Sequence, residues 1–283
     1  MPQTINTNLA SLNAQRNLAE SQSSLATSMQ RLSSGLRVNS ARDDAAGLAI
    51  AERMNSQVRG MNVAIRNAND GISHAQTAEG ALANVGDALQ RMRELAVQSR
   101  NVTNSNSDRD ALNNEFSQLR NEITRVLDGT RFNGQGVFTA TGTLEFQVGA
   151  GTTGNDRIGV ALGTAALNAA TTITDVTTGA AASIGATMTG GQIDTVIQNI
   201  DNAINLVNSE RSRWGATQNR FDAVISNLRV NVENQSAARS RIMDADFAVE
   251  TANLSRAQIL QQAGNAMVAQ ANQQPQMVLS LLR

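Results

Sequence analysis

Apolar residues recur along most of the chain at alternating spacings of three and four, which is the spacing of one face of an α-helix. In one long run the residues of this seam lie seven apart, namely Met54, Met61, Ala68, Ala75, Leu82 and Leu89. The seam keeps its phase across the turn-like residues 69–71, so one helix is expected from about residue 41 to residue 99. A second seam from Ile193 to Val232 predicts another long helix, and helices of this length without breakers are typical of a coiled coil or a bundle.

A shorter helix and a small β region are expected between the two long helices. Ser107–Asp110 has the form of a capping pattern, and the apolar stripe that follows it ends at Gly129. The stretch Thr164–Thr189 predicts a low-complexity surface loop with weak strand content. A small antiparallel sheet is predicted from β-prone runs at residues 136–139, 144–148 and 158–162.

Both ends of the chain carry apolar stripes as well. Termini of most soluble domains are polar and frayed, so an apolar stripe there indicates a surface that a partner covers. We expect the two terminal helices to pair antiparallel, to be poorly ordered in the monomer and to order on assembly. The residues expected to carry assembly are Leu18, Leu25, Leu32, Leu254, Leu260, Met267, Leu279 and Leu282.

The composition of the 283-residue chain narrows its chemistry. All 23 basic residues are Arg and the net charge is -1, so lysine chemistry is excluded and nucleic-acid binding is disfavoured. With 0 Cys there is no disulfide and no thiolate. The first ten residues lack the features of a secretory signal, and no apolar run is long enough to span a bilayer. We therefore expect no membrane insertion and, if the chain is exported, no cleaved signal peptide.

Few residues are candidates for catalysis or ligand binding. His74 is the single histidine and lies beside the first seam, so a packed or surface role is preferred over a metal ligand. Asp43 and Asp44 are interpreted as helix-start residues, because carboxylates are favourable at that end of a helix. Trp214 and Phe221, seven apart, are expected to be core residues. We expect no enzyme activity, no metal and no cofactor.

The chain closely resembles bacterial flagellin, the subunit of the flagellar filament. Its motifs occur at both ends of the chain in the order that the family has. The residues that carry the resemblance are Ile5–Ala10, Arg31–Ser40, Asp43–Ala51, Arg66–Ser73, Thr77–Leu82, Gln90–Ser99, Arg131–Gly136 and Gln273–Leu282.

The resemblance implies a mainly α fold. It would comprise an elongated antiparallel coiled-coil or helical-bundle rod with a small β-hairpin region, and an inner domain of two helices formed by the paired chain ends. The middle of the chain is short, as in a near-minimal flagellin. The implied divisions are residues 1–41 and 243–283 for the inner domain, 42–162 and 192–242 for the rod, and 163–191 for a variable surface segment.

The resemblance also implies a function and a set of partners. The chain would polymerise with itself into the extracellular filament that drives swimming, after passing through the flagellar type III export apparatus. Further implied partners are the flagellar cap, the hook-filament junction proteins and an export chaperone on the C-terminal helix. Host toll-like receptor recognition would use Arg91, Leu95 and Glu115, with Leu95 expected to be exposed beside Arg91, on a surface that otherwise contacts neighbouring subunits.

Two alternatives remain open from the sequence alone. A hook-filament junction protein shares the terminal domains, and a secreted adhesin or immune ligand would use the Thr-rich middle. Glycosylation of Ser and Thr residues in that middle is left undecided.

Overall fold

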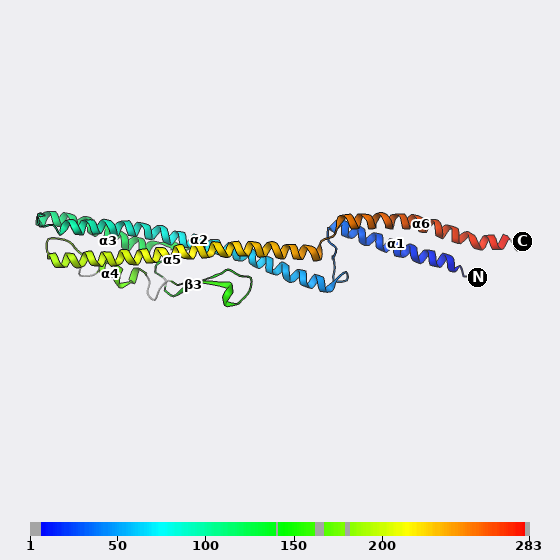
Figure 1. Ribbon diagram of the computed structural model, residues 1–283, viewed down its shortest axis with the longest axis horizontal. Coiled ribbons are helices and arrows are strands. Elements are labelled where there is room, and N and C mark those ends of the chain that lie inside the picture. Colours follow the sequence, from blue (N-terminus) through cyan, green and yellow to red (C-terminus); the bar gives the residue numbers. More distant parts are fainter. Residues whose placement is uncertain (1–6, 140, 162–166, 179–181, 281–283) are drawn as a thin grey trace. The chain divides into compact units, whose positions relative to one another are not determined.

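The computed structural model describes residues 7–139, 141–161, 167–178 and 182–280, and the side chains within these ranges except those of Ala161 and residues 274–280 (Figure 1). The chain forms two compact units, one of Met1–Gln57 with Glu233–Arg283 and one of Val58–Val232. The unit boundaries fall inside the two longest helices. The expected fold class, mainly α with a small β-hairpin region and a pair of terminal helices, is confirmed.

Helix α2 spans Ala45–Ser99 and runs without interruption through residues 69–71, as the seam predicts. It begins four residues later than expected, because the Asp44 side chain accepts a hydrogen bond from the Gly47 N–H and so caps the helix. Asp43 belongs to the preceding turn, where its side chain accepts from the backbone N–H groups of Asn39 and Ser40. The helix-start interpretation is therefore correct for Asp44, while Asp43 holds the turn before it.

Helix α3 spans Asn106–Gly129 and starts from a different cap than predicted. The Ser105 hydroxyl accepts from the Asp108 N–H, and the Asp108 carboxylate accepts from the Ser105 N–H and hydroxyl. The predicted cap at Ser107–Asp110 is wrong, because Ser107 already lies inside the helix. The reciprocal bonding at Ser105 satisfies amide groups that a helix start leaves unpaired.

Helix α5 spans Gly190–Met243 and forms the main core of the second unit with α2 and α3. Trp214 is 4% exposed and Phe221 is 0% exposed, so their prediction as core residues is confirmed. The largest fully buried side chains from these helices are Leu82, Leu89, Met92, Leu95, Phe116, Ile123, Leu127, Ile193, Ile200 and Phe221.

Among the described residues the β region comprises two small hairpins. Strands β1 (Arg131–Phe132) and β2 (Gln135–Gly136) pair across a turn in which Asn133 and Gly134 have φ of 49° and 80°. Asn-Gly is the sequence that such two-residue turns prefer. Strands β3 (Thr143–Gln147) and β4 (Arg157–Ala161) pair antiparallel, close to two of the predicted runs, and the short helix η1 (Gly154–Asp156) lies between them.

The predicted strand at residues 136–139 is wrong. Val137 and Phe138 lie beyond β2 and are buried in the core at 1% and 4% exposure. One more backbone hydrogen bond follows Gly136, from the Val137 N–H to the carbonyl of Thr130, and there the pairing ends because the paired segment becomes helix α3. Burial accounts for the apolar residues that follow.

The Thr-rich segment contains a helix instead of a surface loop. After the short helix η2 (Leu167–Ala169), helix α4 (Thr171–Thr177) packs on α3 and buries Ile173 and Val176. Farther along, Ile184 is 0% exposed and its N–H donates to the Asn113 side chain on α3. The loop prediction is therefore wrong for residues 167–178, whose apolar residues meet α3. Residues 182–189 do form a loop, but part of it is buried and not at the surface. Residues 164–166 and 179–181 lie outside the described ranges.

In the first unit, helix α1 (Leu9–Ser34) and helix α6 (Phe247–Ser280) lie side by side (Figure 1). Helix α1 ends at Gly35, whose φ of 71° is the left-handed conformation common after a helix. The chain then pairs Leu36 with Asp244 in an isolated bridge. A small apolar cluster centred on Val38, Ala51 and Met243 supports this connection.

Candidate assembly surface

Helices α1 and α6 run antiparallel. At one end the Asn8 side-chain amide donates to the Ala271 carbonyl at 2.8 Å, and the Ser11 hydroxyl donates to the Asn272 side chain at 2.7 Å. At the other end the Arg31 guanidinium bonds Glu250 at 3.1 Å. Residue numbers rise along one helix as they fall along the other, so the predicted antiparallel pairing of the chain ends is confirmed.

The seam between these helices combines leucines on α1 with small residues on α6. Four predicted leucines are half-buried in this unit: Leu18, Leu25, Leu32 and Leu254. Ala257 and Ala271 on α6 are 4% and 8% exposed. Between them a Cβ on Gly264 would lie 3.0 Å from the Leu18 Cδ1, so the glycine permits the helices to approach closely at that point. Small residues at a helix contact let the backbones come near each other, and they also bury little apolar surface.

Larger apolar residues of α6 lie beside the seam, and about half of each side chain stays in water. Buried positions recur every seven residues, at Glu250, Ala257, half-buried Gly264 and Ala271, whereas Leu260 and Met267 follow the seam positions by three. Three residues turn the helix by about 60° short of a full circle. The sequence grouped Leu260 and Met267 with the seam; that grouping is wrong.

These side chains form an exposed apolar face on α6. We define this exposed α6 face by residues with their exposed fractions: Val249 54%, Ile259 66%, Leu260 50% and Met267 58%. On α1, Leu9, Leu12 and Met29 are also more than half exposed. A run of apolar residues left in water on a helix whose other face is already paired marks a surface for a partner. Of the other predicted assembly residues, the Leu279 side chain and all of Leu282 lie outside the described ranges.

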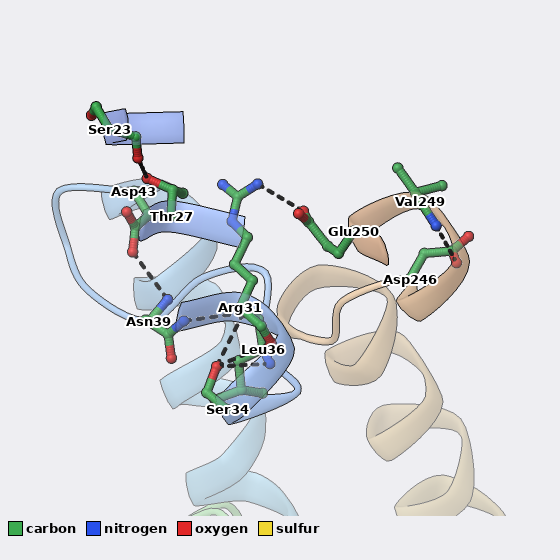
Figure 2. Close-up of polar contacts among 10 residues, drawn as sticks. All are labelled: Ser23, Thr27, Arg31, Ser34, Leu36, Asn39, Asp43, Asp246, Val249 and Glu250. Atoms are coloured by element: carbon green, nitrogen blue, oxygen red, sulfur yellow. Dashed lines mark hydrogen bonds and ion pairs between the residues drawn. The ribbon is translucent and has the colours of Figure 1, made fainter. Parts of the chain in front are cut away.

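The end of the helix pair near Arg31 is polar. Figure 2 shows the Arg31 side chain reaching from α1 to Glu250, which is 6% exposed although its second carboxylate oxygen has no hydrogen-bond partner among the described residues. A groove of about 670 Å³ beside this pair is lined mainly by hydroxyl and amide side chains, including Ser21, Ser28 and Asn253. This ion pair was not predicted from the sequence. The signal for it is that Arg31 lies beside the last leucine of the α1 stripe and Glu250 just before the first leucine of the α6 stripe, so antiparallel pairing brings the two charges together.

Electrostatics in the adjoining turn also favour order. Hydrogen bonds from the Ser40 hydroxyl and from the N–H groups of Ser40 and Asn39 lower the pKa of Asp43, and the charge of Arg31 adds to this effect. The carboxylate therefore stays ionised and keeps the turn that leads into α2 closed at neutral pH.

The surface predicted for receptor recognition lies on the second unit and is only partly as expected. Arg91 bonds Glu115 on α3 at 2.8 Å and Glu94 on its own helix at 2.9 Å, and these hydrogen bonds raise its pKa. Both Arg91 and Glu115 are about half exposed. Leu95 is 0% exposed, so its prediction as an exposed anchor is wrong. The position one turn after Arg91 faces the core that α2 shares with the neighbouring helices.

His74 is packed among aromatic rings. This agrees with the packed role, one of the two roles that the sequence favoured. Its ring centroid lies 5.3 Å from that of Phe132 and 5.4 Å from that of Trp214. Burial lowers the pKa of His74 below its ordinary value, so the ring is neutral at pH 7. Within the described ranges no group of three or more potential metal ligands comes together, and no helix there is long and apolar enough to cross a bilayer.

Comparison with known proteins decides the family. The bacterial flagellin N-terminal helical region matches residues 5–143, and the bacterial flagellin C-terminal helical region matches residues 197–282. A flagellin of Halalkalibacterium halodurans is 48% identical over 280 residues, covering 99% of each chain. The chain belongs to the bacterial flagellin family. The resemblance inferred from the motifs is thereby confirmed.

Further relatives agree with a filament role. The flagellar filament 33 kDa core protein of Treponema phagedenis is 41% identical to this flagellin over 290 residues, covering 99% of each chain. A solved structure from Vibrio parahaemolyticus, described as a flagellar hook-associated protein, covers 71% of this flagellin with a TM-score of 0.56 and 13% identity. That likeness shows the fold alone, so it gives no support to the hook-filament junction alternative. This flagellin is a structural subunit of the flagellar filament.

Proposed function

We propose that this flagellin polymerises with itself through the exposed α6 face, and that the resulting extracellular filament drives swimming. The observation that carries the proposal is the exposure of Leu260 and Met267 on a helix whose adjacent face is already paired with α1. In a helical polymer each subunit presents two different surfaces that do not close on each other, so growth continues at the end. A neighbouring copy would remove this apolar face from water, which favours association.

The remaining parts of the proposal follow from family membership. Export proceeds through the flagellar type III apparatus without a cleaved signal peptide, with a chaperone on the C-terminal helix beforehand and the cap and hook-filament junction proteins as later partners. The inner domain comprises residues 1–41 and 243–283, and its helices become fully ordered only when neighbours cover them. The chain has no enzyme activity in this role.

The test is polymerisation of a Leu260→Ser/Met267→Ser double variant. Full burial of a Leu or Met side chain is worth about 1.5–3 kcal/mol. Since about half of each side chain is exposed, losing both should weaken each subunit addition by about 2 kcal/mol, or about thirtyfold in critical concentration. Sedimentation of filaments from purified chain measures this value, and circular dichroism checks that helix content is retained.

Val102→Ser serves as the matched control. Val102 is 92% exposed in the turn between α2 and α3, so its loss removes wet apolar surface away from the terminal helices. We expect this variant to polymerise at the wild-type concentration. Equal critical concentrations for the double variant and the control would contradict an assembly role for the exposed α6 face.

We also propose toll-like receptor recognition through the exposed Arg91–Glu115 pair, with Leu95 supporting α2 from the core. An exposed Arg held in place by a carboxylate is a suitable interface anchor, because its geometry is fixed before binding. Reporter cells expressing the receptor should respond less to Arg91→Ala than to Arg125→Ala, an exposed Arg paired within α3. Equal responses would remove Arg91 from the recognition surface.

A further inference from the structure

Two methionines are exposed on the helices proposed for assembly. Of the methionines whose side chains the structure describes, Met29 and Met267 are the exposed ones, at 56% and 58%. By contrast, Met61, Met92 and Met243 are 6%, 0% and 7% exposed. Met267 belongs to the exposed α6 face, whereas the buried methionines fill cores.

The neighbours of Met267 leave its sulfur accessible. The residues three and four positions before it are Gly264 and Ala263, and those three and four positions after it are Gln270, which is exposed, and Ala271. Side chains at these spacings lie next to each other on a helix surface. Three of these four neighbours are too small to cover a thioether, and with Gln270 in place Met267 is still 58% exposed, so oxidants in water reach its side chain.

The rest of the chain offers no more reactive sulfur. With 0 Cys there is no thiol to react first, so thioethers are its oxidisable sulfur groups. Hydrogen peroxide transfers one oxygen atom to a thioether: a sulfur lone pair attacks one oxygen, the S–O bond forms as the O–O bond breaks, and the other oxygen leaves as water. The product sulfoxide is polar and chiral, and methionine sulfoxide reductases convert it back to the thioether, with a dithiol supplying two electrons and the oxygen leaving as water.

We propose that Met267 is an oxidation site at which peroxide blocks assembly of the free chain, while the assembled filament is protected. This inference rests on the proposed role of the exposed α6 face. A sulfoxide oxygen at Met267 must lose its water when a neighbouring copy covers the face, and an apolar interface gives it no hydrogen-bond donor. The critical concentration should therefore rise at least about tenfold. In the filament the covered sulfur should react at least about tenfold more slowly than in the free chain.

The first experiment uses polymerisation to separate assembly-competent from assembly-incompetent chains in a partly oxidised wild-type sample. Full-length chain is treated briefly with hydrogen peroxide, quenched and polymerised, and peptide mass mapping then measures the sulfoxide fraction at each methionine in pellet and supernatant. We expect Met267 sulfoxide to be enriched about tenfold in the supernatant and to vanish from it after sulfoxide reductase treatment, with assembly restored. Equal Met267 sulfoxide fractions in pellet and supernatant overturn the proposal.

The second experiment compares Met267→Leu with Met243→Leu, the same change at a buried position. For each protein the readout is the ratio of critical concentrations with and without peroxide. We expect this ratio to fall close to one for Met267→Leu and to stay high for Met243→Leu; equal ratios overturn the assignment to Met267. Failure of untreated wild-type chain to polymerise overturns the proposed function, whereas normal polymerisation unaffected by peroxide overturns this inference alone.

Discussion

Gly71 on α2 is where one added methyl group has its clearest consequence. A Cβ at this position would lie 2.6 Å from the Phe221 Cζ and 2.8 Å from its Cε2. Carbon atoms in contact prefer about 3.5–4.0 Å, so the ring would have to retreat by about 1 Å. Phe221 is 0% exposed and meets Phe146 edge to face at 5.3 Å, so it has no free space to enter.

Gly71→Ala therefore sets helix propensity against overpacking. Ala is favoured over Gly inside a helix by about 1 kcal/mol. Forcing extra carbon into a packed core costs about 1–3 kcal/mol, and the short distances to an aromatic ring place this site at the upper end. We expect Gly71→Ala to lower the free energy of unfolding by about 2 kcal/mol.

Gly80 on the same helix is the matched control. A Cβ there meets nothing within 4 Å, and the residue is exposed. Gly80→Ala should raise the free energy of unfolding by about 1 kcal/mol, because only the propensity term remains. The two variants should then differ by about 6–12 °C in Tm, using about 2–4 °C per kcal/mol for a domain of this size.

Urea unfolding followed by Trp214 fluorescence measures both variants. Trp214 is the single tryptophan and is 4% exposed, so its emission reports the core that contains Gly71 and Phe221. A Gly71→Ala chain as stable as the wild type, or as stable as Gly80→Ala, would refute the packing argument. It would mean that the long helix, rather than the Phe221 contact, governs this position.

Three further results are expected. Because burial lowers the pKa of His74, the unfolded chain binds the proton more readily, so stability is fully present above the unfolded pKa of about 6.5 and falls as the pH drops toward the folded pKa. In His74→Leu the urea midpoint should therefore change less between about pH 7.5 and 5.5 than in the wild type. Parallel plots of midpoint against pH for the two proteins would contradict this. Arg31→Ala leaves the buried Glu250 carboxylate without its partner and should cost about 2–3 kcal/mol of stability, below the range for fully buried pairs because the Arg31 side chain is 31% exposed. Glu250→Gln should cost about 1 kcal/mol. Hydrogen exchange of α1 amides in filaments measures both losses, and equal losses would contradict a stabilising role of the ion pair. Ser105→Ala removes the α3 cap and should cost about 1 kcal/mol of stability in thermal unfolding, while Ser107→Ala inside the helix should be close to neutral. A larger loss for Ser107→Ala than for Ser105→Ala would favour the cap predicted from the sequence.

Core positions could be predicted from the sequence where a helix has one apolar stripe and packs that stripe into one core. The seam of α2 placed Leu82 and Leu89 correctly, and the seven-residue spacing of Trp214 and Phe221 indicated core positions that are indeed buried. Such patterns survive because a helix repeats its facing every seven residues, and burying that face supplies most of its stability.

Predictions failed where either of two neighbouring helix faces could be the buried one, or where either of two residues could be the helix cap. Leu95 follows Arg91 by one turn, and spacing could not reveal that it belongs to the buried core of the second unit. Leu260 has the periodicity of a seam residue, but the register of α6 against α1 turns it outward. The Thr-rich segment was predicted as a loop because α4 is short and polar. Ile173 is buried because α4 packs on α3, a contact that the local sequence does not show.

The sequence by itself determined the helical stripes, the terminal apolar residues and the flagellin motifs, since each depends on residues close together in the chain. Tertiary structure decided which side of α6 meets α1, and thereby left Leu260 and Met267 in water. It also brought Arg31 to Glu250 and the Phe221 ring to Gly71, pairs that are far apart in sequence. The physical reason is that periodicity fixes the facing of a helix relative to itself, whereas its partner and register depend on close contacts, such as Gly264 against Leu18, that no single stripe contains.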